Sequence, residues 1–351
     1  MADSDASWRQ VLDSYAEPRL SRSLFDLATS VVPYLALVVA IYFSLRVSLV
    51  LALVLGIPAA GFLIRTFIVF HDCAHGSFLR SKRANAALGA ALGVLVWLPF
   101  QRWRHEHAVH HATAGDLDRR GIGDVWTLTV AEYRARLWWG RLGYRAFRNP
   151  FVMFGLGWLL VLVVKPRVVS RSAHRRIRAS VIGTDLALLL LVGGLCLSLG
   201  WRTYLVLQAP TLLLTGAVGI WLFYVQHQFE STYWETNDGW SYDDAALHGS
   251  SYLKLPGVLQ FFTGNIGLHH VHHLSARIPN YNLQSAHDET SGLQAVPAIT
   301  LGEALHTLQD SWSHQGVPDV PRFGDAAFGC DAARAWGHPK SCGPLRRDGC
   351  N

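Results

Sequence analysis

The sequence predicts an all-α integral membrane protein, with four transmembrane helices in two hairpins and a helical cap on the cytoplasmic side. Three observations predict this fold: a shortage of charged residues, four long apolar runs, and positive charge concentrated between the two hairpins. Charged residues make up 16% and hydrophobic residues 50% of the 351 residues, whereas an ordinary soluble domain is roughly 25% charged. This composition excludes a disordered chain, a collagen and a coiled coil, and it argues against a soluble enzyme.

Four apolar runs have about the length of 20 residues that a helix needs to cross a bilayer. The first two runs are separated by little more than residues 45–46 and the last two by residues 201–202, so each pair predicts a tight hairpin. Two shorter runs, at 84–100 and 150–164, are marginal for crossing and predict re-entrant or interfacial helices. The predicted transmembrane helices are 26–44, 47–70, 180–200 and 203–226.

The distribution of positive charge predicts the orientation of these helices. The segment between Phe70 and Ser180 contains 18 Lys and Arg, whereas the hairpin tips carry one each, Arg46 and Arg202. Because positively charged loops remain in the cytoplasm, both termini and segment 71–179 are predicted to be cytoplasmic. Topology therefore accounts for the net charge of +6, and no nucleic-acid partner is expected.

Histidine is the unusual component of this apolar chain, with 17 residues. Most of them lie in HDCAH at 71–75, WRHEHAVHH at 103–111 and HHVHH at 269–273, and His227 follows the fourth predicted span. Spacings of three and four residues put the imidazoles of each stretch on one helix face. The predicted topology, which was inferred without the histidines, brings all four segments to the same side of the membrane. The sequence therefore predicts a metal site there.

The number of histidines predicts two metal ions, because eight or nine imidazoles exceed the six positions of one ion. Imidazole binds Zn, Cu, Fe and Ni, so the ligand type alone does not select the metal. Neutral ligands around two Fe ions would leave the metals strongly electrophilic, which suits oxygen activation. Carboxylates near the histidines are predicted to orient imidazole N–H groups; these are Asp72, Glu106 and Glu230.

The remaining histidines do not follow this spacing. His105 and His270 lie inside the clusters, so each is predicted either to support a ligand from outside the coordination sphere or to have no role in the site. The scattered histidines are predicted to be structural or solvent-facing; these are His174, His248, His287, His306, His314 and His338.

Three segments carry a resemblance to a known family. HDCAHGSF, WRHEHAVHHATAGDLD and GNIGLHHVHHLSARIPNY resemble the three histidine boxes of the integral-membrane fatty acid desaturases, especially the bacterial and plastid acyl-lipid branch, which shares the context of FYVQHQFE. The resemblance extends from about Phe62 to Asn282. It implies a di-iron site in the cytoplasmic cap, with Asn265 as a candidate for holding a metal-bound water. The implied iron ligands are His71, His75, His107, His110, His111, His227, His269, His272 and His273.

The resemblance also implies an activity: the removal of two hydrogens from adjacent methylenes of an acyl chain, with O2 as co-substrate. The implied substrate is a membrane lipid or fatty acid, and the implied location is a bacterial inner membrane. No haem or flavin motif is visible, so the electrons are expected from a separate donor such as ferredoxin or a small haem protein.

Two other functions remain open at this point. A lipid or carotenoid hydroxylase or ketolase would use the same di-iron site. A metal-binding or transport protein would be expected to carry charged residues within its spans, but these contain only Asp26, Arg65 and Asp185.

The chain is predicted to have three parts: a cytoplasmic N-terminal segment (1–25), a desaturase membrane and cap domain (26–284) and a cytoplasmic C-terminal tail (285–351). Three of the five cysteines, Cys330, Cys342 and Cys350, lie in this tail without a CxxC spacing. The tail is therefore predicted to be reduced and to lack a zinc site.

Overall fold

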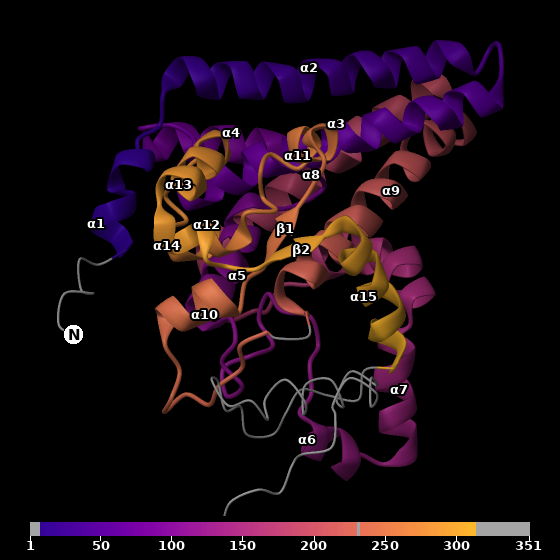
Figure 1. Cartoon of the computed structure of the whole chain (residues 1–351). Helices are drawn as coiled ribbons and strands as arrows, with labels where there is room; N and C mark the ends of the chain where they lie inside the picture. Colours follow the sequence, from indigo (N-terminus) through magenta and orange to yellow (C-terminus); the bar gives the residue numbers. More distant parts are fainter. Residues whose placement is uncertain (1–7, 230–231, 314–351) are drawn as a thin grey trace, which may run out of the picture.

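Two long helical hairpins form the apolar part of the molecule in a computed structural model, which describes residues 8–229 and 232–313 (Figure 1). The first hairpin consists of α2 (Leu20–Ser44) and α3 (Leu49–His75), and the second of α8 (Arg175–Leu199) and α9 (Trp201–His227). All four helices are long and apolar enough to cross a membrane. The predicted all-α membrane fold is confirmed.

The ends of the hairpin helices follow from local chemistry. Ser48 caps α3 by accepting a hydrogen bond from the Leu51 amide, as helix N-termini require. The second hairpin turns at Gly200 alone, which has φ 85°, a conformation that glycine adopts without steric cost. The prediction that residues 201–202 form the link is therefore wrong, because both already belong to α9. Helix α3 continues to His75, so the first histidine cluster lies within the helix instead of following it.

The two shorter apolar runs form parts of bent helix pairs. Helix α4 (Lys82–Leu95) meets α5 (Phe100–Thr113) at 103°, and α7 (Trp138–Arg148) meets the segment Phe151–Arg167 at 63°. The first bend requires a glycine, because a Cβ at Gly93 would lie 2.5 Å from the Leu98 carbonyl oxygen. The second segment contains two π-helical stretches and a short 3-10 turn: η2 (Phe151–Leu156), η3 (Leu159–Val164) and η4 (Lys165–Arg167).

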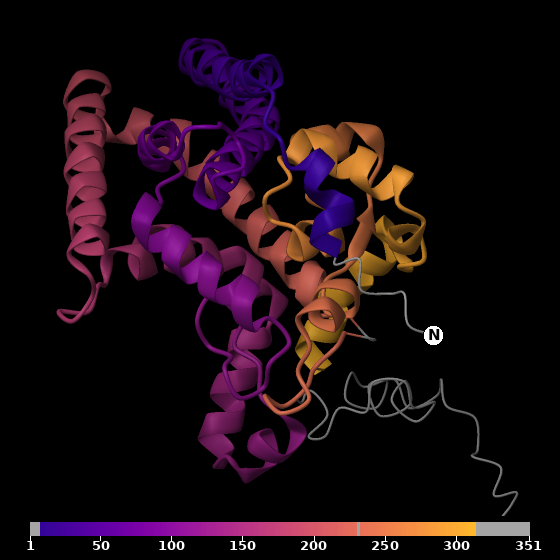
Figure 2. The ribbon, with the colours of Figure 1, turned by 90° about the vertical axis from the view of Figure 1, so that its left-hand side faces the viewer.

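We call residues 100–148 and 232–313 the cap. In Figure 2, helix α8 lies at the edge of the molecule opposite the orange C-terminal segments of the cap, and its beginning contacts α5, where the Gln101 amide donates to Ser180 Oγ at 3.1 Å. Besides α5 and α7, the cap contains α6 (Val130–Ala135), α10 (Tyr242–His248), β1 (Tyr252–Lys254), α11 (Gly257–Phe262), α12 (His269–Leu274), η5 (Asn280–Asn282), α13 (Leu283–Glu289), α14 (Ser291–Gln294), β2 (Ala298–Thr300) and α15 (Leu301–Ser313).

Both predicted domain boundaries fall inside helices. The boundary at residue 284 lies within α13, and the following β2 pairs in parallel with β1. In α15, Ala304 is buried in a core cluster with Tyr224 and Leu253. At the other end, α1 (Trp8–Leu12) precedes η1 (Asp13–Tyr15) and lies beside the C-terminal cap helices (Figure 2). Leu12 is part of the same buried apolar cluster as Leu283 and Leu293. Residues 8–25 and 285–313 therefore pack with the cap and membrane helices.

Candidate metal centre

Four helices bring nine histidines together in two groups. Within each group, one nitrogen per ring lies within 4.8 Å of the corresponding nitrogen of every other member. These nine are the histidines that the sequence singled out as ligand candidates. The five-histidine group consists of His71, His75, His107, His111 and His272, and the four-histidine group of His110, His227, His269 and His273.

Helices α5 and α12 each contribute histidines to both groups. On α5, His107 and His111 are four residues apart and belong to the five-histidine group, whereas His110 belongs to the four-histidine group. On α12, His269 and His273 share the four-histidine group and His272 faces the other. Side chains three and four residues apart are neighbours on a helix, so these two helices fix the positions of the groups relative to one another.

The ring nitrogens converge within each group. His111 Nε2 lies 3.1 Å from His107 Nε2 and 3.1 Å from His272 Nε2. In the other group, His227 Nε2 lies 3.0 Å from His110 Nε2 and 2.9 Å from His269 Nε2. Two imidazole nitrogens bound at about 2.1 Å to one ion, at a right angle, would be roughly 3 Å apart. The observed separations therefore fit shared metal ligands.

Hydrogen bonds on the far side of two rings orient them. His110 Nδ1 donates to Asp124 Oδ1 at 2.6 Å, and His227 Nδ1 donates to the Gly249 carbonyl oxygen at 3.0 Å. A carboxylate and a carbonyl oxygen only accept, so both Nδ1 atoms carry a proton. The two Nε2 atoms, on the opposite side of each ring, lie 3.0 Å apart. A metal ion bound by both Nε2 atoms fits this arrangement.

Burial keeps the cap histidines neutral. Loss of solvent, reinforced by the neighbouring imidazoles, lowers the pKa of His269, His272 and His273 well below the ordinary value. The neutral imidazole is the form that binds metals. Several buried ring nitrogens also have no hydrogen-bond partner within the described residues: His75 Nε2, His111 Nδ1, His269 Nδ1 and His273 Nε2. The donor set thus fits two transition-metal ions.

The carboxylates predicted to orient the ligands differ in their contacts. Asp72 accepts from His71 Nδ1 at 3.2 Å. Glu106 instead pairs with Arg102, one turn earlier on α5, at 3.0 Å, so the prediction that Glu106 orients an imidazole is wrong. Glu230 lies outside the described residues.

The other predicted supporting residues make different contacts. The Asn265 side-chain amide donates to the Asn280 carbonyl oxygen at 3.0 Å, and its role in holding a metal-bound water stays a prediction. His105 is exposed on α5. His270 is fully buried, but its Nε2 lies 3.3 Å from His287 Nδ1, on the other side of α12.

Three contacts of the site were not predicted from the sequence. Asp124 and the Gly249 carbonyl orient His110 and His227, and the Trp103 indole stacks on His107 at a centroid distance of 4.3 Å. Trp103 has a sequence signal, since it precedes His107 by four residues on the same helix face. Asp124 comes from a loop without periodicity, and a backbone carbonyl has no signature in side-chain identity.

The fold and the site define a helical membrane protein with two buried histidine groups, each of which could hold a metal ion. Comparison with known proteins gives the family: the model of the family described as "Fatty acid desaturase" matches residues 46–299. A protein named "Fatty acid desaturase" from Bacillus subtilis is 47% identical over 295 residues, which cover 84% of this chain and 84% of the relative. The chain belongs to the fatty acid desaturase family, and it is an oxidoreductase of that family.

More distant relatives include proteins named as lipid desaturases. An "sn-1 oleoyl-lipid 12-desaturase" from Synechocystis sp. is 27% identical over 240 residues, 63% of each chain. An "sn-1 acyl-lipid omega-3 desaturase (ferredoxin)" from the same organism is 26% identical over 243 residues, 63% of this chain and 62% of the relative.

Proposed function

We propose that this desaturase uses O2 and two iron ions, held by the nine histidines, to introduce a double bond into the acyl chain of a membrane lipid. The observation that carries the proposal is the convergence of nine histidines in two groups, within each of which one nitrogen per ring lies within 4.8 Å of the others. Bound iron supplies the redox chemistry that activates O2 for attack on an unactivated C–H bond.

The residues of the chain position the ligands for this chemistry. Asp72, Asp124 and the Gly249 carbonyl each hold an imidazole by its Nδ1–H, so that the Nε2 lone pair is directed to the metal. Such outer partners fix both the tautomer and the orientation of a ligand ring. The chain must also hold one pair of methylenes against the centre, because a desaturation removes hydrogens from two adjacent carbons.

A lipid-carried acyl chain is the proposed substrate. Two of the relatives carry names that specify acyl lipids. The helices that contribute His71, His75 and His227 are also candidate membrane spans, so the centre is built directly onto membrane helices. A substrate already in the bilayer would reach it without leaving the membrane.

The proposed electron donor is a ferredoxin or a small haem protein, and the proposed location is a bacterial inner membrane with the termini and histidines on the cytoplasmic side. One relative has ferredoxin in its name. The segment from α6 through α7 exposes Arg134, Arg136, Arg141 and Arg145, which suits an acidic donor. Electron transfer from such a donor should slow as ionic strength rises.

Expression in a bacterium of defined lipid composition tests the activity. We expect an acyl chain that loses two hydrogens in cells with the wild-type protein, and no change in cells with His107→Ala at equal abundance in the membrane. A product that gains an oxygen instead would favour the hydroxylase alternative. Activity retained by His107→Ala, or wild-type protein purified without iron, would contradict the di-iron proposal.

A further inference from the structure

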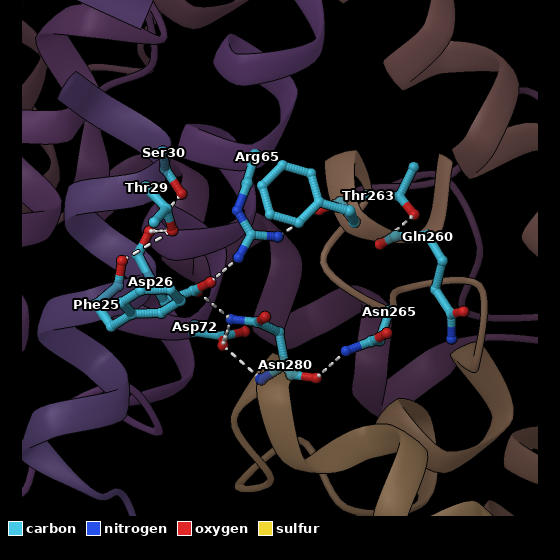
Figure 3. Close-up of polar contacts among 11 residues, drawn as sticks. Phe25, Asp26, Thr29, Ser30, Arg65, Asp72, Gln260, Thr263, Asn265 and Asn280 are labelled. Carbon is cyan, nitrogen blue, oxygen red and sulfur yellow. Dashed lines mark hydrogen bonds and ion pairs between the residues drawn. The ribbon is translucent and has the colours of Figure 1, made fainter. Parts of the chain in front are cut away.

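A series of buried polar contacts leads from the membrane helices to Asp72 (Figure 3), which contacts His71 of the five-histidine group. It begins with the ion pair between Asp26 of α2 and Arg65 of α3. Asn280 of η5 then bridges two carboxylates, because its side-chain Nδ2 donates to Asp26 Oδ2 at 2.9 Å and to Asp72 Oδ2 at 2.9 Å. Asp72 Oδ1 in turn accepts from His71 Nδ1.

We propose that Asn280 and the Asp26–Arg65 ion pair are positioning residues for His71, an inference that rests on the proposed function of the histidines as iron ligands. The Asn280 backbone amide also donates to Asp72 Oδ2, at 2.8 Å. Two donors therefore occupy one oxygen of Asp72, which leaves the other oxygen for His71. The rotation of the carboxylate, and through it the plane of the imidazole, is fixed from outside the metal centre.

The contacts of Asp72 connect the ion pair to the ligand. Arg65 pairs with Asp26, at the end of this series of contacts away from His71. Asp72 has no Lys or Arg partner among the described residues, and its carboxylate accepts hydrogen bonds from His71 and Asn280. All of these side chains are buried, so water does not compete for these contacts.

The surrounding structure holds Asn280 in place. Its carbonyl oxygen accepts from Asn265 Nδ2 at 3.0 Å. Gly264 has φ 52°, and a Cβ there would lie 2.7 Å from the Ile68 side chain and 3.2 Å from Asn280 Oδ1. The turn before the third histidine cluster is thus packed closely against α3 and against the amide that bridges the two aspartates.

A purely structural link between α2 and α3 would not need these residues. Charged side chains in membrane helices are costly and are mostly retained for function, and apolar packing can replace a buried ion pair without loss of stability. What apolar side chains could not supply is the donor to Asp72. The contact of Asn280 with both carboxylates therefore favours a role in positioning His71 over a role that only attaches α2 to α3.

Iron release from the purified protein tests the proposal. The rate at which Fe²⁺ passes to an excess of chelator is measured for wild type, Asn280→Ala, Asp26→Ala and the double variant. We expect Asn280→Ala to accelerate release of one of the two ions by about 10- to 100-fold, the usual effect of losing an outer partner. The double variant should be no faster than Asn280→Ala alone, since residues that act through one another are not additive.

A second readout and a matched control separate positioning from stability. The absorption bands of the Co²⁺-loaded protein should change in Asn280→Ala, whereas Asp185→Asn, which breaks the ion pair between Arg167 and Asp185, should change neither the bands nor the release. If the alanine variants do not accumulate, Asp26→Asn and Asn280→Ser replace them.

Three results would overturn the proposal: unchanged bands and release in the variants, additive effects in the double variant, or a lower melting temperature with wild-type metal properties. A wild-type protein that binds no iron would instead contradict the proposed function itself.

Discussion

The two histidine groups are held by different parts of the molecule. The five-histidine group takes His71 and His75 from the first hairpin, and Asp72 of the same helix orients His71. The four-histidine group takes His227 from the second hairpin, and its outer partners, Asp124 and the Gly249 carbonyl, come from loops of the cap. Each hairpin therefore contributes histidines to one group, whereas α5 and α12 contribute histidines to both groups.

The largest expected effect comes from adjacent residues of α12 that belong to different groups. His272→Ala and His273→Ala should each reduce desaturation by more than about 100-fold, because loss of a ligand exceeds the 10- to 100-fold cost of losing an outer partner. Metal analysis together with lipid analysis checks this. Each variant should lose iron from its own group and retain the other ion. If both variants lose both ions, the groups are not separate sites.

A smaller effect is expected for the carboxylates that orient the rings. Asp72→Asn and Asp124→Asn should each weaken one iron site by about 10- to 100-fold, since the amide accepts the imidazole N–H less strongly than a carboxylate. Titration with Fe²⁺ measures both affinities. Glu106→Gln is the matched control, because Glu106 pairs with Arg102, and its affinities should equal those of wild type. An effect of Glu106→Gln as large as that of Asp124→Asn would argue against ring orientation as the cause.

The buried pair His270 and His287 contrasts with both groups, because it consists of two rings at hydrogen-bond distance and belongs to neither group. Burial lowers the pKa of His287, so the unfolded chain binds the proton more tightly than the folded one. Stability contributed by His287 is therefore complete above about pH 6.5 and is lost as the pH falls below it.

Unfolding by denaturant at pH 7.5 and pH 5.5 measures this dependence. We expect His287→Phe to reduce the pH dependence by about 1 kcal/mol or less, with wild-type iron content. A His287→Phe protein with an unchanged pH dependence would show that His287 is not the group that titrates.

The smallest effect is expected at His105, which the sequence places within the second cluster but the structure exposes on α5. His105→Ala should change the free energy of unfolding by less than about 0.5 kcal/mol and should leave iron content and desaturation at wild-type levels. Loss of iron from this variant would mean that the second cluster uses its residues differently from the observed arrangement.

Helical periodicity explains why so much of the site could be predicted. A spacing of three or four residues brings imidazoles to one helix face, and this property depends only on residues close in sequence. The same spacing does not tell which member of His107, His110 and His111 joins which group. That division depends on how α5 packs against α3, α9 and α12.

The parts of the site that could not be predicted depend on contacts distant in sequence or on the backbone. Asp124 reaches His110 from a loop, and Gly249 contributes only a carbonyl. Glu106 is close to the histidines in sequence, but its carboxylate pairs with Arg102, one turn away on the same helix. The boundary predicted at 284 falls within α13, and the pairing of β1 with β2 joins segments whose short strands have little signal of their own.

The participation of α12 in both groups has a consequence for biosynthesis. His272 meets His111 across 161 residues of chain, and Asn280 meets Asp72 across 208. The ribosome releases the N-terminal parts first, so both hairpins can enter the membrane before α12 has been synthesised. Neither histidine group is complete until then. If the groups hold iron as proposed, both sites are completed only in a nearly finished chain, and a protein truncated before residue 269 would lack histidines of both groups.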